Sequence, residues 1–541
     1  QFFIFNLLQL TIYAYTSATP ETALFNVRLN ELCVGGRVEE AEHLLLNSLA
    51  CTISMDGNNC LKLGKIVAVE CSLDLKWHNV EPDITSFNTV MNGWTKHGRK
   101  QVRRRAEGLL KKLQMMSEIS QQGDNDADFV GYTYPQPNEV SYNIALNGLA
   151  KGGAPERAEE LLAQMEVSDQ AWKNPTLISY NTCIDAWACS NSKHAHIKAG
   201  NIVKKMIRKG IEPNTITYSN MIRCYRPILA EVDDAAQQCE KILWTMKKKA
   251  KESSDPSKIA PNVVTYTSVI ESFAKSKHPK AAKKADNLFR EMLVDEDTPA
   301  PNLRTFRAIV NAWAKSYDLD APKKIAEIIQ LVEEKHASGH ENMAPSVVLY
   351  AELANAWAKS KNPSKAKRAA SILRKVTRVY QETGSAAMRP NVHLYHAVLN
   401  ACSSCANSAY YDSQSQRDAL KVAFAVFKNM EKQKYAVPDV STYDLLFRAA
   451  RNLLPIGGAR NDVVIALFEK CKRDGFVGDH IVKLVKSCAD EKTYSDMFAC
   501  AIGEEDESCC KYGKKVVHLH KIPKDWRRKA SDFNHSENRL I

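Results

Sequence analysis

The chain has 541 residues, which excludes a single ordinary hydrophobic core and predicts several domains or an array of repeats. Apolar residues make up 44% of the sequence and charged residues 25%, so the composition is sufficient for folding. The formal net charge is +12, a sign that suits a polyanionic partner such as nucleic acid.

The N-terminal segment, residues 1–19, is apolar. Asn6, Gln9 and Thr11 interrupt it, and it is too short to predict a membrane-spanning helix. The chain does not begin with Met. Whether this segment is the true N-terminus, or a truncation that has lost a transit peptide, is therefore left open.

From residue 20 onward an aromatic residue recurs four or five positions after a proline. These ten anchor residues are Phe25, Phe87, Tyr142, Tyr180, Tyr218, Tyr266, Phe306, Tyr350, Tyr395 and Tyr443. Successive anchors lie 38 to 62 residues apart, which predicts an array of about ten units over residues 20–476.

Each unit is predicted to be a pair of helices. In EVSYNIALNGLAKGGAPERAEELLAQME (139–166), apolar residues recur at helical spacing in two blocks. The first block contains Tyr142, Ala145, Leu146 and Leu149, and the second contains Ala158, Leu161, Leu162 and Met165. Gly152 and Gly153 suit the turn between the helices, and the proline before the next unit ends the second helix.

Trp94, Trp187, Trp313 and Trp357 each follow an anchor by seven residues, so they share its helix face. One hairpin cannot bury its apolar face alone, whereas stacked hairpins can. The predicted fold is therefore all-α, a right-handed α-solenoid superhelix of helix-turn-helix repeats, with no strand pattern. Residues 477–541 are predicted to form a helical cap and a basic tail.

These motifs resemble the pentatricopeptide repeat. The shared pattern is V-x-Y-N, then A-K, then A-x-x-L-L-x-x-M and a closing Pro-Asn, as in residues 139–166. The tetratricopeptide repeat fits less well, because it lacks the Pro-polar and Tyr-polar entry. The family period is near 35 residues, and the longer units here resemble P-type members with elongated repeats, as in algae and protists.

The resemblance implies sequence-selective binding of single-stranded RNA, one base per repeat. It assigns base reading to the residue after each anchor, here called the reader, and to the residue after the proline that ends the unit, here called the partner. The pairs are Asn26 with Asp83, Asn88 with Asn138, Asn143 with Thr176, Asn181 with Asn214, Ser219 with Asn262, and Thr267 with Asn302. The implied preference is U-pyrimidine-N-pyrimidine-A-A, 5′ to 3′.

The resemblance also assigns two supporting roles. Aliphatic residues three positions before the reader would sandwich the base: Val140, Ile178, Ile216, Val264 and Val348. Lysines nine positions after the anchor would bind phosphate: Lys96, Lys151, Lys275, Lys315 and Lys359. The later pairs, Arg307 with Ser346, Ala351 with Asn391 and His396 with Asp439, are not standard readers, so residues 139–302 are the best candidates for sequence reading.

Each of these patterns has a structural alternative. Short polar residues near a helix start can be caps, and a lysine near a helix end can simply complement the helix dipole. The lone Cys-x-x-Cys at Cys402 and Cys405 is interpreted as core, because Cys402 occupies the position held by Trp in other units and a zinc site would need more ligands.

No catalytic, metal or cofactor site is predicted. The 65 residues after the array are too few for the nuclease domain of a protein-only RNase P. Three functions stay open: an RNA-binding protein acting in RNA processing, stability or translation in a mitochondrion or chloroplast, a protein–protein scaffold without base reading, and a fragment that has lost a nuclease domain.

Overall fold

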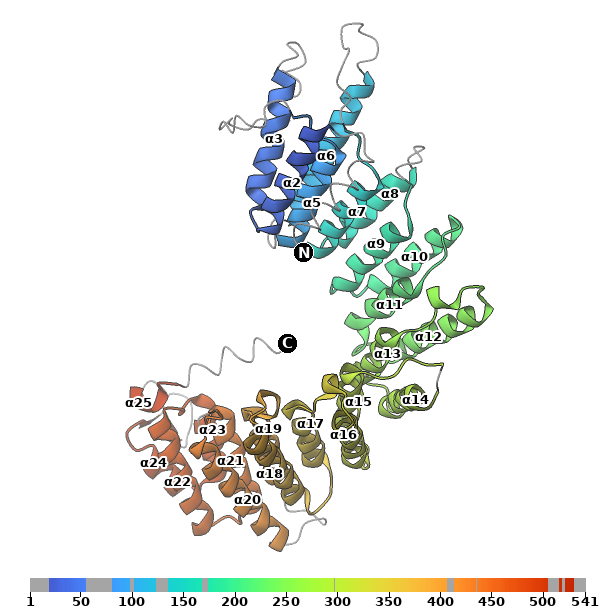
Figure 1. The fold of residues 1–541 in the computed structure, drawn as a ribbon. Coiled ribbons are helices and arrows are strands. Elements are labelled where there is room, and N and C mark those ends of the chain that lie inside the picture. The colour runs from blue at the N-terminus through green and yellow to red at the C-terminus, as the bar shows by residue number, and fades with distance from the viewer. Residues whose placement is uncertain are drawn as a thin grey trace. The chain divides into compact units, whose positions relative to one another are not determined.

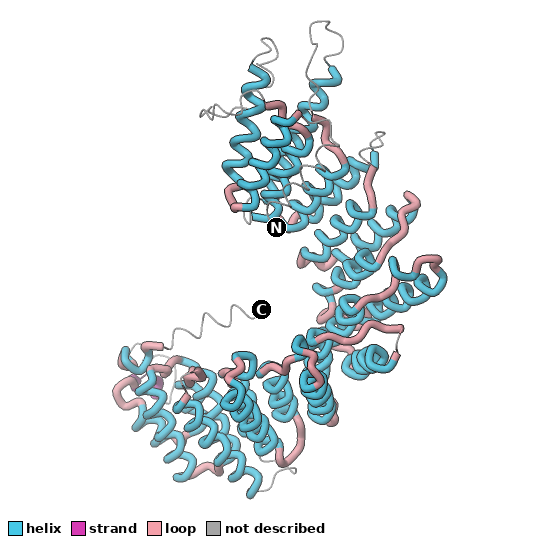
Figure 2. The backbone as a smooth tube through the Cα atoms, viewed as in Figure 1, coloured by secondary structure: helices cyan, strands magenta, loops and turns pink. Residues whose placement is uncertain are grey.

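The computed structural model describes residues 19–54, 80–97, 102–122, 135–167, 174–295, 297–405, 413–433, 435–504, 515–517 and 521–529. The chain divides into two compact units, Gln1–Ser272 and Phe273–Ile541, whose boundary falls inside one helix. Over the described residues each unit consists mainly of helices joined by loops (Figures 1 and 2). The N-terminal apolar segment lies outside them except for Thr19.

The helices alternate between two kinds. The first helices of the hairpins, the A helices, are α2 (Pro20–Val34), α5 (Ile84–His97), α7 (Glu139–Lys151), α9 (Leu177–Cys189), α11 (Thr215–Cys224), α13 (Val263–Lys275), α15 (Leu303–Lys315), α17 (Val347–Lys359), α19 (Val392–Ser403), α21 (Val440–Leu453) and α23 (Asp479–Cys488). The second helices, the B helices, are α3 (Val38–Ser54), α6 (Val102–Gln122), α8 (Pro155–Val167), α10 (Ala195–Arg208), α12 (Ala235–Glu252), α14 (Ala281–Val294), α16 (Ala321–Ala337), α18 (Lys365–Thr383), α20 (Ser413–Lys432), α22 (Gly458–Asp474) and α24 (Glu491–Met497).

The hairpin of α7 and α8 forms as the sequence predicts. The apolar residues expected on each helix are buried. Gly152 ends α7, and Gly153 has φ of +68°, in the left-handed region that favours glycine. Asn138 begins α7 as its N-cap, with its side chain accepting from the backbone N–H of Ser141 at 3.1 Å.

The hairpins stack into an α-solenoid. In both units an A helix packs against its own B helix and against the next A helix, as α7 does with α8 and α9, and α17 does with α18 and α19 (Figure 1). All ten anchors are buried, as are Trp94, Trp187, Trp313 and Trp357. The aromatic positions thus form the core between neighbouring hairpins, as predicted.

The extra repeat length lies in the B helices and the loops after them. Five A helices, α7, α9, α13, α15 and α17, all have 13 residues. The B helices range from 13 residues in α8 to 21 in α6, leaving α24 aside. Because these five A helices keep one length, equivalent positions on those that are neighbours stay in register.

The C-terminal region differs from the prediction in one respect. It contains a two-stranded antiparallel pair, β1 (Ile502–Glu504) and β2 (Lys515–Val517), in which Ile502 lies opposite Val517. The strands were missed because each has only three residues, too few to show an alternating pattern.

The described part of the tail folds back onto the hairpin of α21 and α22. The short helix α25 (Lys524–Arg527) packs on α22. The Val477 N–H donates to the Trp526 carbonyl at 2.8 Å, and the Lys529 N–H donates to the Gly475 carbonyl at 2.9 Å. We therefore propose that α23, α24 and this segment cap the array, in line with the sequence-based boundary at residue 477.

Cys402 and Cys405 are both fully buried, and burial raises the pKa of both thiols. Cys402 fills the core position that Trp occupies in α5, α9, α15 and α17, as expected. Over the described residues, no helix is both long and apolar enough to cross a membrane.

Candidate nucleic-acid interface

The A helices leave one row of apolar side chains in solvent. Five residues at equivalent positions are 40% to 60% exposed: Val140, Ile178, Ile216, Val264 and Val348. The first four lie on α7, α9, α11 and α13 within the first unit, and Val348 lies on α17 in the second. Branched aliphatic residues repeated at an exposed position are not core, so they mark a surface available to an apolar partner.

The predicted readers meet their predicted partners directly in three repeats of the first unit. Asn26 Nδ2 donates to Asp83 Oδ1 at 3.1 Å, Asn88 Nδ2 to Asn138 Oδ1 at 3.5 Å, and Asn181 Nδ2 to Asn214 Oδ1 at 3.2 Å. Residues 33 to 57 positions apart in the sequence are thus joined across neighbouring repeats.

The Asn143 pair is joined through a third residue. Glu139 Oε1 accepts from Asn143 Nδ2 at 3.2 Å and from Thr176 Oγ1 at 2.7 Å. Ser179 Oγ also donates to Asn143 Oδ1 at 2.7 Å. Glu139 is a carboxylate that the sequence did not single out, and it places a negative charge beside this reader.

The Ser219 reader reaches its partner through the next helix. The hydroxyls of Ser219 and Thr265 lie 2.9 Å apart, and Thr265 Oγ1 donates to Asn262 Oδ1 at 3.1 Å. The last pair of the first set, Thr267 and Asn302, falls in different units. Thr267 is buried, and Asn302 is an exposed N-cap whose Oδ1 accepts from the Thr305 N–H at 3.1 Å.

A serine or threonine directly before the anchor completes most of these contacts. Ser86 Oγ donates to Asn26 Oδ1 at 2.5 Å, and Thr217 Oγ1 donates to Asn181 Oδ1 at 2.6 Å. Sequence reasoning missed these residues, although the recurring Ser/Thr-Phe/Tyr dipeptide was a visible signal. The reader, the partner and this hydroxyl therefore form one polar cluster between consecutive A helices.

The partner residues are also helix caps. In five of them the side chain accepts a hydrogen bond from the backbone N–H three residues later, at 2.8 to 3.1 Å. These five are Asp83, Asn138, Asn214, Asn262 and Asn302. Capping is therefore the correct structural account of the partner position. It does not account for the readers, whose amides bond to side chains of the next repeat.

The second unit has a different set of side chains at the reader position. Arg307 is exposed, and Ala351 is buried. His396 Nε2 lies 3.0 Å from both Asp439 Oδ1 and Thr442 Oγ1, and His480 Nε2 lies 2.7 Å from Asp444 Oδ1. The His396–Asp439 pair predicted from the sequence is in contact.

The predicted phosphate-binding lysines are exposed at the ends of their A helices. Two of them bond to the preceding repeat: Lys151 Nζ donates to the Thr95 carbonyl at 2.9 Å, and Lys359 Nζ donates to the Ala314 carbonyl. Lys151 and Lys359 therefore have a structural role at helix ends. An ammonium has three N–H donors, so one such bond leaves others available.

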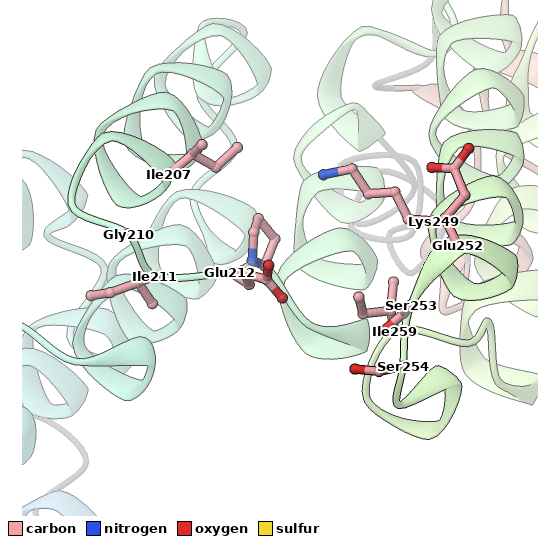
Figure 3. Close-up of a pocket in the computed structure, with 10 residues that line it drawn as sticks. Ile207, Gly210, Ile211, Glu212, Lys249, Glu252, Ser253, Ser254 and Ile259 are labelled. Carbon is pink, nitrogen blue, oxygen red and sulfur yellow. The ribbon is translucent and has the colours of Figure 1, made fainter.

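A separate cavity of about 550 Å³ lies in the first unit, between the end of α10 and the end of α12 (Figure 3). Ile207, Gly210 and Ile211, from the end of α10 and the loop after it, line one side. Lys249 and Ile259 line the other side, together with the serines after α12. The long α12 and the loop 253–262, where this repeat exceeds the family length, form that wall.

The described residues contain no cluster of three or more His, Cys, Asp or Glu side chains able to hold a metal ion. Taken together, stacked hairpins with an exposed aliphatic row and a paired polar row define a helical-repeat protein whose A helices carry a candidate binding surface. Comparison with known proteins narrows this class.

Two family models match the chain. The model described as "PPR repeat" matches residues 140–169, and the model described as "Pentatricopeptide repeat domain" matches residues 175–226 and 249–316. The matched residues are thus similar to pentatricopeptide repeats. Repeats of this class bind single-stranded RNA with two or three side chains per base.

Curated relatives come from Arabidopsis thaliana. A pentatricopeptide repeat-containing protein is 30% identical over 169 residues, covering 31% of this chain and 25% of that protein. A chloroplastic pentatricopeptide repeat-containing protein is 26% identical, and the match covers 40% of this chain and 23% of that protein. The small ribosomal subunit protein mL103 (rPPR7) is 22% identical, and the match covers 25% of this chain and 36% of that protein. The chain thus spans between 23% and 36% of the length of these relatives.

Solved structures with a similar fold include the pentatricopeptide repeat protein PPR10 from maize, at 16% identity and a TM-score of 0.45, covering 91% of this chain and 72% of that one. Yeast Rmd9p in complex with a 16-nt target RNA is similar at 10% identity and a TM-score of 0.33, over 85% and 87% of the two chains. The similarity to pentatricopeptide repeats is carried by the repeat matches and not by these superpositions.

Proposed function

We propose that this protein binds single-stranded RNA selectively along the A helices of its first unit. The observation that carries the proposal is the row of exposed Val and Ile side chains beside a row of paired polar side chains. An unpaired base has two apolar faces and a polar edge. The first row suits the faces and the second suits the edge.

The aliphatic row supports this function because of its position. Val140, Ile178, Ile216 and Val264 each stand three residues before a reader, so each reader lies about one turn from an exposed aliphatic on the same helix. Bases entering between such side chains would cover apolar surface that water otherwise contacts. That burial provides affinity without regard to base identity.

The polar row would provide selectivity. Asn181 is buried between repeats, and its carbonyl and amino group are held by Thr217 and Asn214, so its orientation is fixed before a ligand arrives. A pre-oriented amide loses little entropy on binding. The proposed preference is the one that the family resemblance implies, U-pyrimidine-N-pyrimidine-A-A from Asn26 to Thr267.

We further propose that binding serves RNA processing, stability or translation in a mitochondrion or chloroplast, without a catalytic step by this chain. One of its relatives is described as chloroplastic and another as a ribosomal subunit protein, which supports an organellar setting.

The test is selection from a randomised single-stranded RNA pool by the purified chain, with sequencing, at two salt concentrations. A pyrimidine-then-adenine core should be enriched. Ser219→Asn should change the base preferred at one position from A to a pyrimidine, while the rest of the core stays. Affinity that falls with salt, with no enriched core, would leave a non-selective RNA binder.

A scaffold role is the second candidate for the second unit alone. His396 and Asp444 are held by Asp439 and His480, and Ala351 offers no polar group. These side chains suit contact between repeats better than base reading. Absence of RNA binding by the whole chain, even at low salt, would overturn the RNA proposal and favour a scaffold.

A further inference from the structure

A third row of polar residues lies on the A helices, one turn beyond the readers. Six A helices carry asparagine five positions after the anchor, here called the amide row. Its members are Asn30, Asn92 and Asn147 in the first unit, and Asn311, Asn355 and Asn400 in the second. All six are partly or fully exposed. Neither the base readers nor the lysines account for this recurrence.

The amide row differs from the reader row in its hydrogen bonding. Reader amides such as Asn26 and Asn181 donate and accept within the protein. Among the described residues, no side-chain nitrogen of the amide row donates a hydrogen bond to the protein. The only side-chain acceptor in use is Asn92 Oδ1, which receives Thr95 Oγ1 at 3.2 Å. The amide row therefore has donors and acceptors available to a ligand.

Helix geometry places the amide row between the other two rows. Val140, Asn143, Asn147 and Lys151 follow the spacing i, i+3, i+7, i+11, which keeps one face of α7. At about 1.5 Å of rise per residue, Asn147 lies about 6 Å along the helix from Asn143 and the same from Lys151. The same order of aliphatic, Asn and Lys recurs on α17, with Val348, Asn355 and Lys359.

Neighbouring members of this row lie close enough to act on adjacent nucleotides. On α9 and α11 the same position holds Asp185 and Arg223, and Arg223 Nη1 lies 2.6 Å from Asp185 Oδ1. Consecutive A helices thus bring this position together. Asn92 and Asn147 occupy it on α5 and α7, which pack against each other.

We infer that the amide row binds the ribose 2′-hydroxyl groups of the RNA and so distinguishes RNA from DNA. This inference rests on the proposed function. The ribose lies between base and phosphate in a nucleotide, as the amide row lies between the readers and the lysines. An uncharged amide both donates and accepts, which matches a hydroxyl, whereas phosphate is better served by a cation.

The test compares the full-length chain with the variant Asn92→Ala/Asn147→Ala. The probes are the randomised single-stranded RNA pool and a 2′-deoxy pool of the same bases made with deoxyuridine. The variant should lose about tenfold in RNA affinity, the loss of two ordinary hydrogen bonds, and retain its DNA affinity. The matched control is Asn201→Ala/Asn287→Ala, which removes two exposed amides on the B helices α10 and α14.

The other outcomes overturn the inference in separate ways. An equal loss of affinity for RNA and DNA would mean that the amide row contacts phosphate or base. Unchanged affinity for both would mean that the amide row does not contact the nucleic acid. Both would leave the proposed function intact. A wild-type chain that binds neither pool would overturn the proposed function and this inference together. Circular dichroism and the thermal unfolding midpoint of each variant exclude misfolding as the cause.

Discussion

The Nζ atom of Lys151 lies 2.9 Å from the carbonyl oxygen of Thr95, near the end of the preceding A helix. In the second unit Lys359 makes the same contact with the carbonyl of Ala314, which also lies near the end of the preceding A helix. Carbonyls in the last turn of a helix lack partners within the helix, and a cation there also complements the helix dipole. One residue can thus join two repeats and still present charge to solvent.

We expect Lys151→Gln to lower the free energy of unfolding by at most about 1 kcal/mol, because one exposed hydrogen bond is lost. If the same ammonium also neutralises a phosphate, the slope of log affinity against log salt should fall by about 0.7. Chemical denaturation and binding at several salt concentrations measure the two effects.

Lys315→Gln is the matched control, because Lys315 occupies the same position at the end of α15 and is also exposed. It should leave stability within about 0.5 kcal/mol of wild type and reduce the salt slope equally. An unchanged slope in both variants would restrict these lysines to the protein's own structure.

Asn181→Ala should cost more stability than Asn88→Ala. Asn181 is buried, and its loss leaves Thr217 and Asn214 each without one partner, at about 1 to 3 kcal/mol for unsatisfied buried groups. Asn88 makes one long contact of 3.5 Å and is less buried, so about 1 kcal/mol or less is expected. Urea denaturation compares the two, and an equal loss would contradict the stronger contacts at Asn181.

The sequence was sufficient to predict which residues become neighbours across repeats. The resemblance to the pentatricopeptide repeat implied the pairs Asn26 with Asp83 and Asn181 with Asn214, and the stacking of consecutive A helices brings these positions together. The periodicity of the sequence predicted the buried anchors and the core position of Cys402.

The sequence could not predict how the polar groups share their hydrogen bonds. Glu139 links Asn143 to Thr176, and Lys151 bonds to a carbonyl, because side-chain rotamers decide which of several nearby acceptors is reached. Periodicity gives the face of a helix on which a residue lies. It does not give the partner that a long side chain selects on that face.

Ile178→Ser should separate ligand binding from folding. Ile178 is 60% exposed, so its replacement should change the free energy of unfolding by less than about 0.5 kcal/mol. If a base covers this side chain, RNA affinity should fall about fivefold, or about 1 kcal/mol, for the apolar area no longer buried.

Ile197→Ser provides the control for that variant. Ile197 lies on the B helix α10 and is 52% exposed, so it matches Ile178 in type and exposure but not in helix. Its RNA affinity should equal that of wild type in a fluorescence anisotropy titration. Equal losses in the two variants would argue against an aliphatic row that is specific to the A helices.

The His396–Asp439 contact predicts a pH dependence of stability. Burial would raise the pKa of Asp439, but the hydrogen bond and charge of His396 and the bonds from Thr442 outweigh burial, so the pKa lies below its ordinary value of 3.8. A carboxyl whose pKa is lowered by folding stabilises the protein above the unfolded pKa. That contribution is lost as the pH falls through the folded pKa.

Asp439→Asn isolates this contribution, since Asn serves as the N-cap in several other repeats and keeps the capping function. We expect the wild type to exceed this variant in free energy of unfolding at about pH 5, and the difference to shrink below about pH 4. Urea denaturation across this range measures it. A difference that grows on acidification would mean that folding raises the pKa of Asp439, and would contradict the contact with His396.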